Sequence, residues 1–213
     1  MKKYEFTGTV KNIDGKTLHR IRAVRDIPEY NIKSGDLGGW LEAEKNLSQN
    51  GAAWVTDSAV VMDAACVTGD ARVMDSARVM DSAWVTDSAR VTDSARVTGE
   101  ALVTDSARVT GSALVTDSAR VTGKALVTGK ALVTGSADCI TIGAIGSRND
   151  TTTFYRGTDG GIYVSCGCFS GSIYDFAAKV KAVHAGTKHE KTYLLAVELA
   201  KAQIGTTEEE DKC

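Results

Sequence analysis

A six-residue repeat runs without interruption through the middle of this chain. Alanine recurs at every sixth position from Ala53 to Ala137, and valine does so from Val55 to Val133. Helices repeat about every 3.6 residues and strands about every two, so neither element has this period. A chain wound around a triangular prism has it, because each side needs one short strand and one corner. The repeat therefore predicts a parallel β-helix in which three hexapeptides form one coil.

Each hexapeptide also predicts which side chains face inward. In the unit that begins at Ala71, strand alternation sends Ala71 and Val73 to the interior and Arg72 outward, and the next three residues turn the corner. This phasing resembles the hexapeptide-repeat family of left-handed parallel β-helices. The resemblance implies a left-handed coil, which the period alone does not give, because ordinary parallel crossovers are right-handed.

The outward positions sort into three faces, because residues three repeats apart stack from coil to coil. The first face consists of Trp54, Arg72, Arg90, Arg108 and Leu126, the second of Val60, Arg78, Arg96, Leu114 and Leu132, and the third of Cys66, Trp84, Leu102 and Arg120. Only the third face is mainly apolar through its middle. We therefore expect Cys66, Trp84 and Leu102 to form the interface of a homo-oligomer, with a trimer favoured.

The arginine columns need neighbouring negative charge. Arginines stacked at strand spacing, about 4.8 Å, repel one another unless anions or carboxylates lie between them. Corner aspartates such as Asp75 and Asp87 offer those carboxylates, so we expect Arg and Asp to interleave as a solvated charge lattice. A polyanion-binding face is the alternative. Acidic residues slightly outnumber basic ones in the repeats and the formal net charge is -2, so we expect no nucleic acid as a partner.

The changes of pattern divide the chain of 213 residues into four regions. These are an N-terminal cap with a glycine-rich connector, a β-helix of about five coils, an α+β domain and a disordered tail, at residues 1–51, 52–139, 140–205 and 206–213. Within the cap, Tyr4 to Lys11 and Thr17 to Arg25 alternate apolar and polar residues on either side of Asp14–Gly15, which supplies turn chemistry. They predict a hairpin that covers the first coil.

The region after the repeats predicts a small sheet and two helices. Strand patterns cover residues 140–145, 151–155 and 161–165. Ser172 with Asp175 and Thr187 with Glu190 are capping pairs at the start of two helices. The apolar positions expected to pack on the sheet are Ile173, Phe176, Val180 and Val183 in the first helix and Tyr193, Leu194, Val197, Leu199 and Ile204 in the second.

The segment before the repeats carries a second resemblance. Asp36 to Trp40 and the pair Leu47–Ser48 resemble the approach to the first coil in uncharacterised bacterial and prophage hexapeptide proteins. That branch implies a lineage without a transferable chemistry. Many other hexapeptide proteins are trimeric acyltransferases with a histidine in a coil, whereas His19, His184 and His189 all lie outside the repeats here. The coils therefore offer no general base.

Specific chemistry is expected after the repeats. Residues 143–150 and 167–171 are rich in glycine and serine, and the second segment precedes a helix, whose first N–H groups can bind a phosphate. We expect an anion site there, and ordinary turns are the alternative. The expected ligand-binding residues are Ser147, Arg148, Asn149, Arg156 and Ser170.

Two cysteines, Cys166 and Cys168, alternate onto one face of a strand. We expect small core residues rather than a redox pair or half of a zinc site, because no four ligands stand at zinc spacing. Cys139 and His184 are the best additional ligands. A Cys166 nucleophile paired with His184 is an enzymatic alternative without a recognised motif. We expect no metal or cofactor and nominate no catalytic residue.

These observations favour a noncatalytic binding protein. A rigid oligomeric β-helix would present C-terminal domains to a ligand or partner, and the prophage resemblance suggests a phage protein that sequesters a small nucleotide-derived host signal. The alternatives are a divergent acyltransferase or another enzyme that uses the C-terminal Cys and His residues, and a purely structural scaffold. The N-terminus lacks a signal peptide's hydrophobic stretch and no apolar run approaches a membrane span, so we expect a cytoplasmic protein.

Overall fold

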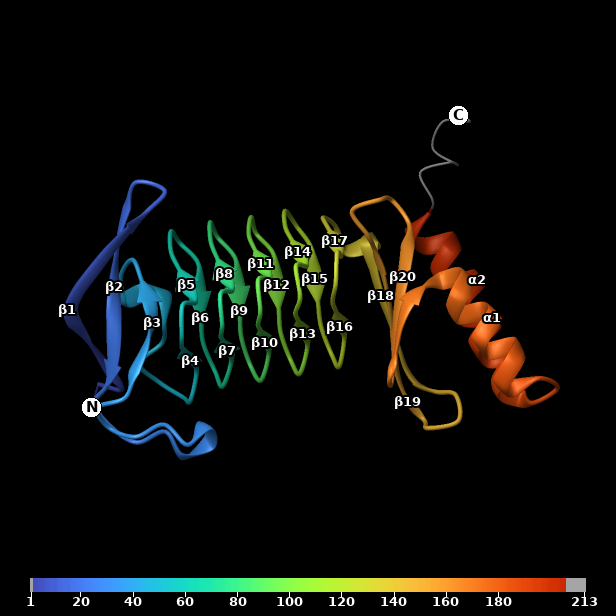
Figure 1. Cartoon of the computed structure of the whole chain (residues 1–213), viewed down its shortest axis with the longest axis horizontal. Coiled ribbons are helices and arrows are strands. Elements are labelled where there is room, and N and C mark those ends of the chain that lie inside the picture. Colours follow the sequence, from blue (N-terminus) through green and yellow to red (C-terminus); the bar gives the residue numbers. More distant parts are fainter. Residues whose placement is uncertain (1, 206–213) are drawn as a thin grey trace.

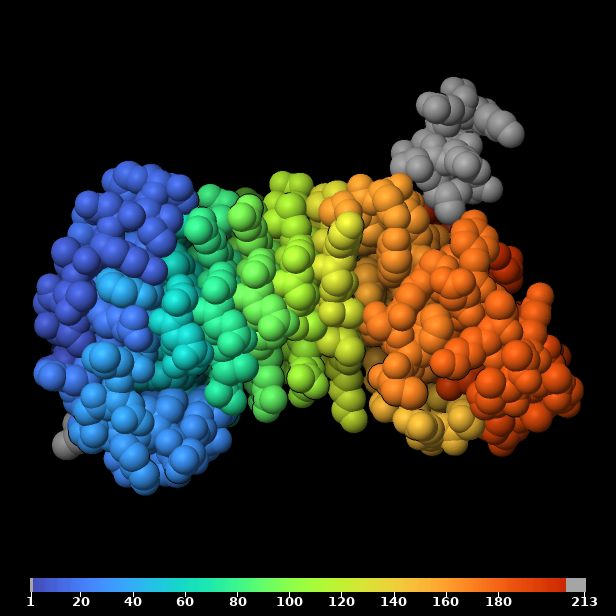
Figure 2. All heavy atoms as spheres, viewed as in Figure 1, coloured from blue at the N-terminus to red at the C-terminus, as the bar shows by residue number. Residues whose placement is uncertain are grey.

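The computed structural model describes residues 2–205, which form a rod with three parts in line (Figures 1 and 2). A β-hairpin lies at one end, a parallel β-solenoid of about 5 coils in the middle, and a small domain with a sheet and two helices at the other end. This arrangement confirms the predicted fold class. The tail expected at residues 206–213 lies outside the described residues.

Each side of the solenoid is a strand of two residues. The strands are β4 (Trp54–Val55), β5 (Val60–Val61), β6 (Cys66–Val67), β7 (Arg72–Val73), β8 (Arg78–Val79), β9 (Trp84–Val85), β10 (Arg90–Val91), β11 (Arg96–Val97), β12 (Leu102–Val103), β13 (Arg108–Val109), β14 (Leu114–Val115), β15 (Arg120–Val121), β16 (Leu126–Val127) and β17 (Leu132–Val133). Every third strand pairs in parallel, which confirms the three predicted faces: β4-β7-β10-β13-β16, β5-β8-β11-β14-β17 and β6-β9-β12-β15.

Between the two capped ends, the interior of the prism is filled by the small and β-branched side chains of the repeat. All alanines and valines of the register from Ala53 to Val133 are buried, and at most 1% of the surface of each residue is exposed. Each coil also donates its backbone N–H groups to carbonyl groups of the next coil, as Arg72 N does to Ala89 O at 2.9 Å. Ala137 ends the register, because it is exposed in a short 3-10 helix, η3 (Ser136–Asp138).

The corners bind the coils to one another through aspartate. Asp57, Asp75 and Asp93 adopt the left-handed backbone conformation, with φ of 56°, 59° and 59°, which aspartate tolerates better than most residues. Their Oδ2 atoms accept N–H groups of the next coil: Asp93 N donates to Asp75 at 3.2 Å and Gly111 N donates to Asp93 at 3.0 Å. The carboxylates therefore point along the rod and not across its faces.

The expected interleaving of arginine and aspartate does not form. Among the described residues, Arg78 is the one arginine of the three faces that makes a salt bridge, and its partner is Asp14 of the hairpin turn, 3.5 Å away. The physical reason is the aspartate geometry, because most corner carboxylates accept an amide N–H of the next coil. They are Asp57, Asp63, Asp75, Asp81, Asp87, Asp93 and Asp105. Arg90, Arg96, Arg108 and Arg120 are exposed to solvent, whereas Arg72 is half-buried against the Tyr30 ring.

The N-terminal cap extends one face of the solenoid. Strands β1 (Tyr4–Ile13) and β2 (Lys16–Ala23) form the predicted hairpin, and β3 (Leu37–Leu41) pairs with β2 on one side and in parallel with β5 on the other. Two 3-10 helices, η1 (Pro28–Tyr30) and η2 (Glu44–Asn46), lie in the connecting segments. The hairpin and connector close the first coil, where the buried Lys3 Nζ donates to Ala53 O at 2.7 Å.

The C-terminal domain closes the last coil with an antiparallel sheet. Its strands are β18 (Cys139–Ile145), β19 (Asp150–Arg156), β20 (Ile162–Cys166) and β21 (Phe169–Ser172), and its helices are α1 (Ile173–His184) and α2 (Lys188–Ile204). Tyr155 completes the core of the prism on one face of the sheet, and Thr153 Oγ1 accepts from Leu126 N at 3.0 Å. Phe154 and Val164 pack against the helices.

Both helix starts are confirmed and some details of the domain differ from expectation. The side chains of Ser172 and Thr187 accept the N–H groups of Asp175 and Glu190 at 3.1 and 3.4 Å. Strand β21 was not predicted. Val183 and Leu199, expected to pack on the sheet, are 64% and 51% exposed. The buried stripe of α1 ends at Val180, and that of α2 passes through Ala196 and Ala200 rather than through Leu199. No helix of residues 2–205 is long and apolar enough to cross a membrane.

Candidate functional site

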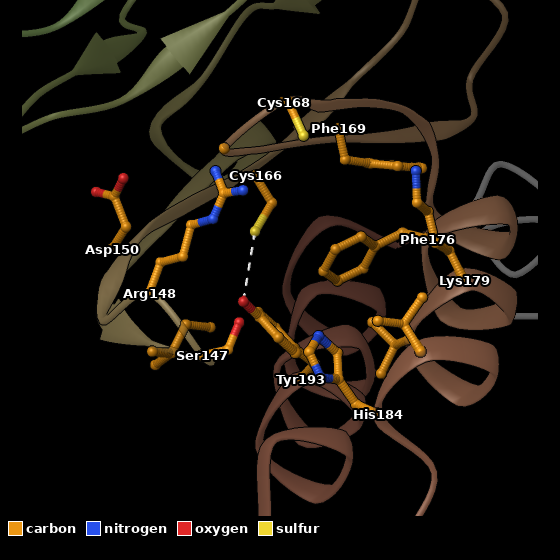
Figure 3. Close-up of a pocket in the computed structure, with 14 residues that line it drawn as sticks. Ser147, Arg148, Asp150, Cys166, Cys168, Phe169, Phe176, Lys179, His184 and Tyr193 are labelled. Atoms are coloured by element: carbon orange, nitrogen blue, oxygen red, sulfur yellow. Dashed lines mark hydrogen bonds between the residues drawn. The ribbon is translucent and has the colours of Figure 1, made fainter.

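A cavity of about 250 Å³ lies in the C-terminal domain, between the β18–β19 turn, the β20–β21 turn and the two helices (Figure 3). Each of these elements contributes side chains to its wall. The lining residues are Ile145, Ser147, Arg148, Asp150, Cys166, Gly167, Cys168, Phe169, Phe176, Lys179, Val180, Val183, His184 and Tyr193. The cavity therefore combines an apolar and aromatic part with polar groups from two turns.

The apolar part of the cavity is built around Phe176. Its ring lies 5.3 Å from that of Phe169 and 5.4 Å from that of Tyr193, the latter edge to face. Phe176 and Val180 are buried one helical turn apart on α1 and so face the sheet together. The rings of Phe169 and Tyr193 are inclined by 52° and 86° to that of Phe176, so each ring offers its own flat apolar face to a ligand.

The positive charge of the cavity comes from Arg148 and Lys179. Lys179 Nζ lies 5.5 Å from the centre of the Phe169 ring, and Arg148 Nη1 lies over the β20–β21 turn, 3.5 Å from where a Cβ of Gly167 would be. Neither forms a salt bridge with a carboxylate of residues 2–205. Asp150 is the one carboxylate in the lining, so two cations face one anion and the site favours a negative ligand.

Tyr193 brings a hydroxyl group to the cavity through a short hydrogen-bonded chain. Thr152 Oγ1 donates to Cys166 Sγ at 3.2 Å, and Cys166 Sγ donates to Tyr193 Oη at 3.8 Å (Figure 3). Burial, followed by the hydrogen bond with Cys166, raises the pKa of Tyr193 to about 12. Tyr193 therefore keeps its proton at neutral pH and can donate it to an acceptor on a ligand.

The turn at Gly146 holds this hydroxyl in place. Gly146 has a φ of 75°, and a Cβ there would lie 1.7 Å from Tyr193 Oη. No side chain fits in that space, so glycine is required both for the backbone conformation and for the approach of the ring. The close approach fixes the β18–β19 turn, which carries Ser147 and Arg148, against α2.

His184 does not pair with Cys166. Its ring lies 5.7 Å from that of Tyr193 and 5.9 Å from that of His189, and Tyr193 lies between His184 and Cys166 (Figure 3). The thiol thus exchanges hydrogen bonds with two hydroxyl groups rather than with a base. Burial, followed by the charge of Asp138, raises the pKa of the distant Cys139 thiol to about 12. No group of three or more metal-ligating side chains occurs within residues 2–205.

The five expected ligand-binding residues do not come together. Ser147 and Arg148 line the cavity, whereas Asn149 lines a separate depression of about 190 Å³ beside the start of α2. Arg156 Nε donates to the buried Asp138 at 2.8 Å, and another of its nitrogens donates to the carbonyl of Ile204 at the end of α2. Ser170 is exposed on β21, outside the cavity lining.

Sequence reasoning missed Lys179 and the aromatic residues of the site. The available signal was the spacing of Phe176, Lys179 and Val180, which places all three on one side of a helix. Tyr193 was expected only as a core residue. Each of these positions acquires its role from the packing of the helices on the sheet, which the sequence pattern does not specify.

Comparison of the sequence with models of known protein families and with curated proteins gives no match.

Proposed function

We propose that this chain is a noncatalytic binding protein that holds a small anionic ligand in the cavity of its C-terminal domain. The observation that carries the proposal is the pair Arg148 and Lys179, two cations without a carboxylate partner among residues 2–205, beside the aromatic residues Phe169 and Phe176. A charge-assisted bond to an anion is roughly twice as strong as a neutral hydrogen bond. The rings supply the complementary surface for a flat apolar group.

A small nucleotide-derived signal has the chemistry that this cavity favours. Its phosphate would bind Arg148 and Lys179, its base would lie on the phenylalanine rings, and Tyr193 would donate to an oxygen. The cavity of about 250 Å³ lies below the usual range for drug-sized ligands, about 300–1,000 Å³, which favours a small occupant. In this proposal the chain is a phage protein of the hexapeptide branch that sequesters such a signal in the host cytoplasm.

The hydrogen-bond partners of Cys166 favour binding without turnover over catalysis. Its thiol lies between Thr152 and Tyr193, and a nucleophilic cysteine needs an adjacent base to take its proton. His184 is not that base, because it contacts the other side of the Tyr193 ring. The ligand would therefore leave the protein unchanged.

The test is ligand binding by variants of Arg148 in the β18–β19 turn and of Lys179 on α1. Native mass spectrometry of protein incubated with bacterial extract should show a retained small molecule, and denaturation should release it with an unaltered mass. Calorimetric titration with the recovered molecule should show a loss of about 10-fold or more in affinity for Arg148→Ala and for Lys179→Ala, the effect of removing one hydrogen bond to a charged group.

Lys181→Ala is the control, because Lys181 is exposed on the same helix and lies outside the cavity lining. Its affinity should equal that of the wild type. Retention of no molecule, or equal losses in all three variants, would exclude this site. If the molecule used in the titration is released from the protein with an altered mass, the protein is instead an enzyme.

A further inference from the structure

One face of the solenoid carries a ladder of arginines. Arg72, Arg90 and Arg108 are directly opposite one another in the parallel strands β7, β10 and β13. The guanidinium of Arg72 lies 4.5 Å from the centre of the Tyr30 ring, whereas Arg90 and Arg108 are exposed. None of the three makes a salt bridge with a carboxylate of residues 2–205. We call these three residues the arginine ladder.

The corner that follows this face carries a ladder of carboxylates. Asp57, Asp75 and Asp93 are exposed and stack in successive coils, where Oδ2 of each accepts a backbone N–H of the next coil, 18 residues later. One oxygen of each carboxylate is thus fixed, and the remaining acceptor positions face solvent. We call these three residues the aspartate ladder.

The two ladders do not neutralise each other within one chain. Arg72 and Arg90 are each followed three residues later by an aspartate of the ladder, Asp75 and Asp93. The aspartates nevertheless bond along the rod, and Arg90 and Arg108 are exposed on the outer face of their strands. Rows of unlike charge thus stand side by side on one surface, and neither row forms a salt bridge within residues 2–205.

The distance between successive arginines of the ladder indicates which kind of partner fits it. Stacked coils repeat about every 4.8 Å, whereas side chains on one face of an extended peptide repeat at about 6.6 Å. Phosphates along one strand of duplex DNA rise by about 3.4 Å per nucleotide along the helix axis and wind around that axis, so they form no straight row at the spacing of the coils. Neither an acidic peptide nor DNA therefore matches successive rungs of the arginine ladder. A row of carboxylates on a second β-solenoid does match them, and this chain carries such a row.

We propose that the arginine ladder binds the aspartate ladder of a second copy of this chain. The two ladders lie next to each other on one chain. In a twofold contact, the arginine ladder of each copy therefore faces the aspartate ladder of the other copy, and both ladders of both copies are neutralised. The contact is distinct from the apolar face of Cys66, Trp84 and Leu102, which belongs to the sheet β6-β9-β12-β15. It also leaves the cavity of the C-terminal domain free.

Sedimentation velocity over a range of salt concentrations tests this contact. Protein with Trp84→Ser, which removes association through the apolar face, should dimerise in ~10 mM salt, where charges act over about 30 Å, and become monomeric in ~1 M NaCl, where they act over about 3 Å. Arg90→Glu with Arg108→Glu should raise the dissociation constant at low salt by about 10-fold or more. Arg120→Glu with Lys181→Glu makes the same change of net charge away from the ladder and should leave it unchanged.

The acidic side is tested without disturbing the coils. In the triple variant Asp57→Asn, Asp75→Asn, Asp93→Asn, asparagine also tolerates the left-handed backbone conformation and keeps an oxygen for the amide of the next coil. It should still unfold in one cooperative thermal transition, with the wild-type circular dichroism spectrum, and lose dimerisation at low salt. In the Trp84→Ser background, a monomer at low salt, association that is indifferent to salt, or a triple aspartate variant that dimerises normally would each overturn the proposal.

Discussion

At the scale of the residue, Asp138 connects the end of the solenoid to the C-terminal domain. Its Oδ1 accepts from Arg156 Nε at 2.8 Å, and its Oδ2 accepts from the Thr134 hydroxyl at 2.6 Å and from Gly135 N at 3.0 Å. Burial acts to raise the pKa of this carboxyl, but the hydrogen bonds from Arg156, Thr134 and Gly135 outweigh it and hold the pKa below its ordinary value. Arg156 thus serves the structure of the domain.

The lowered pKa of Asp138 predicts a dependence of stability on acid. An aspartate with a lowered folded-state pKa stabilises the fold above its unfolded-state pKa, and that stabilisation disappears as pH falls through the folded-state value. Asp138→Asn should therefore be less stable than wild type near neutral pH and should lose less stability on acidification. Urea unfolding at several pH values measures this, with the exposed Asp150→Asn as the control. Equal slopes for Asp138→Asn and wild type would contradict it.

At the scale of the element, the repeat specified the solenoid and much less of the final domain. Ala and Val at fixed spacing leave one way to bury both residues, so the coils, faces and corners follow from the pattern. Strand β21 could not be predicted in this way, because Phe169–Ser172 contains only one large apolar residue before a helix cap. Lys179 and Tyr193 belong to the site only because the helices pack at a particular rotation on the sheet, which depends on tertiary contacts.

The same element-scale logic predicts the cost of a charge within a coil. Val97 is fully buried, whereas its neighbour Arg96 is exposed on the outer face of the same two-residue strand. Val97→Asp places an unpaired carboxylate in a dry prism and should lower the free energy of unfolding by at least about 3 kcal/mol. Arg96→Asp is the matched control and should cost less than about 1 kcal/mol. Chemical denaturation followed by circular dichroism would distinguish them, and similar stabilities would contradict the inward assignment of Val97.

At the scale of the whole molecule, both ends of the rod are closed and its sides are open. The hairpin pairs with the first coil through β3, and the sheet of the C-terminal domain covers the last coil (Figure 1). Covered ends oppose end-to-end association of parallel strands. Assembly of this protein is therefore expected through the long faces, where apolar and charged columns occupy different sheets.

Trp84 is the residue through which the apolar face can be tested. Its side chain is 54% exposed, and Cys66 and Leu102 are its direct neighbours in β6 and β12. If this face forms the proposed homo-oligomer, apolar contacts should hold it at high salt, where the contact between the arginine and aspartate ladders is screened. Light scattering after size-exclusion chromatography in ~1 M NaCl should then give an oligomer for wild type and a monomer for Trp84→Ser.

The control is Leu195→Ser, which replaces an exposed apolar residue on α2 and should leave the mass unchanged. An unchanged mass for Trp84→Ser would show that this face is not the interface, because the removed ring is the most exposed apolar group in its column.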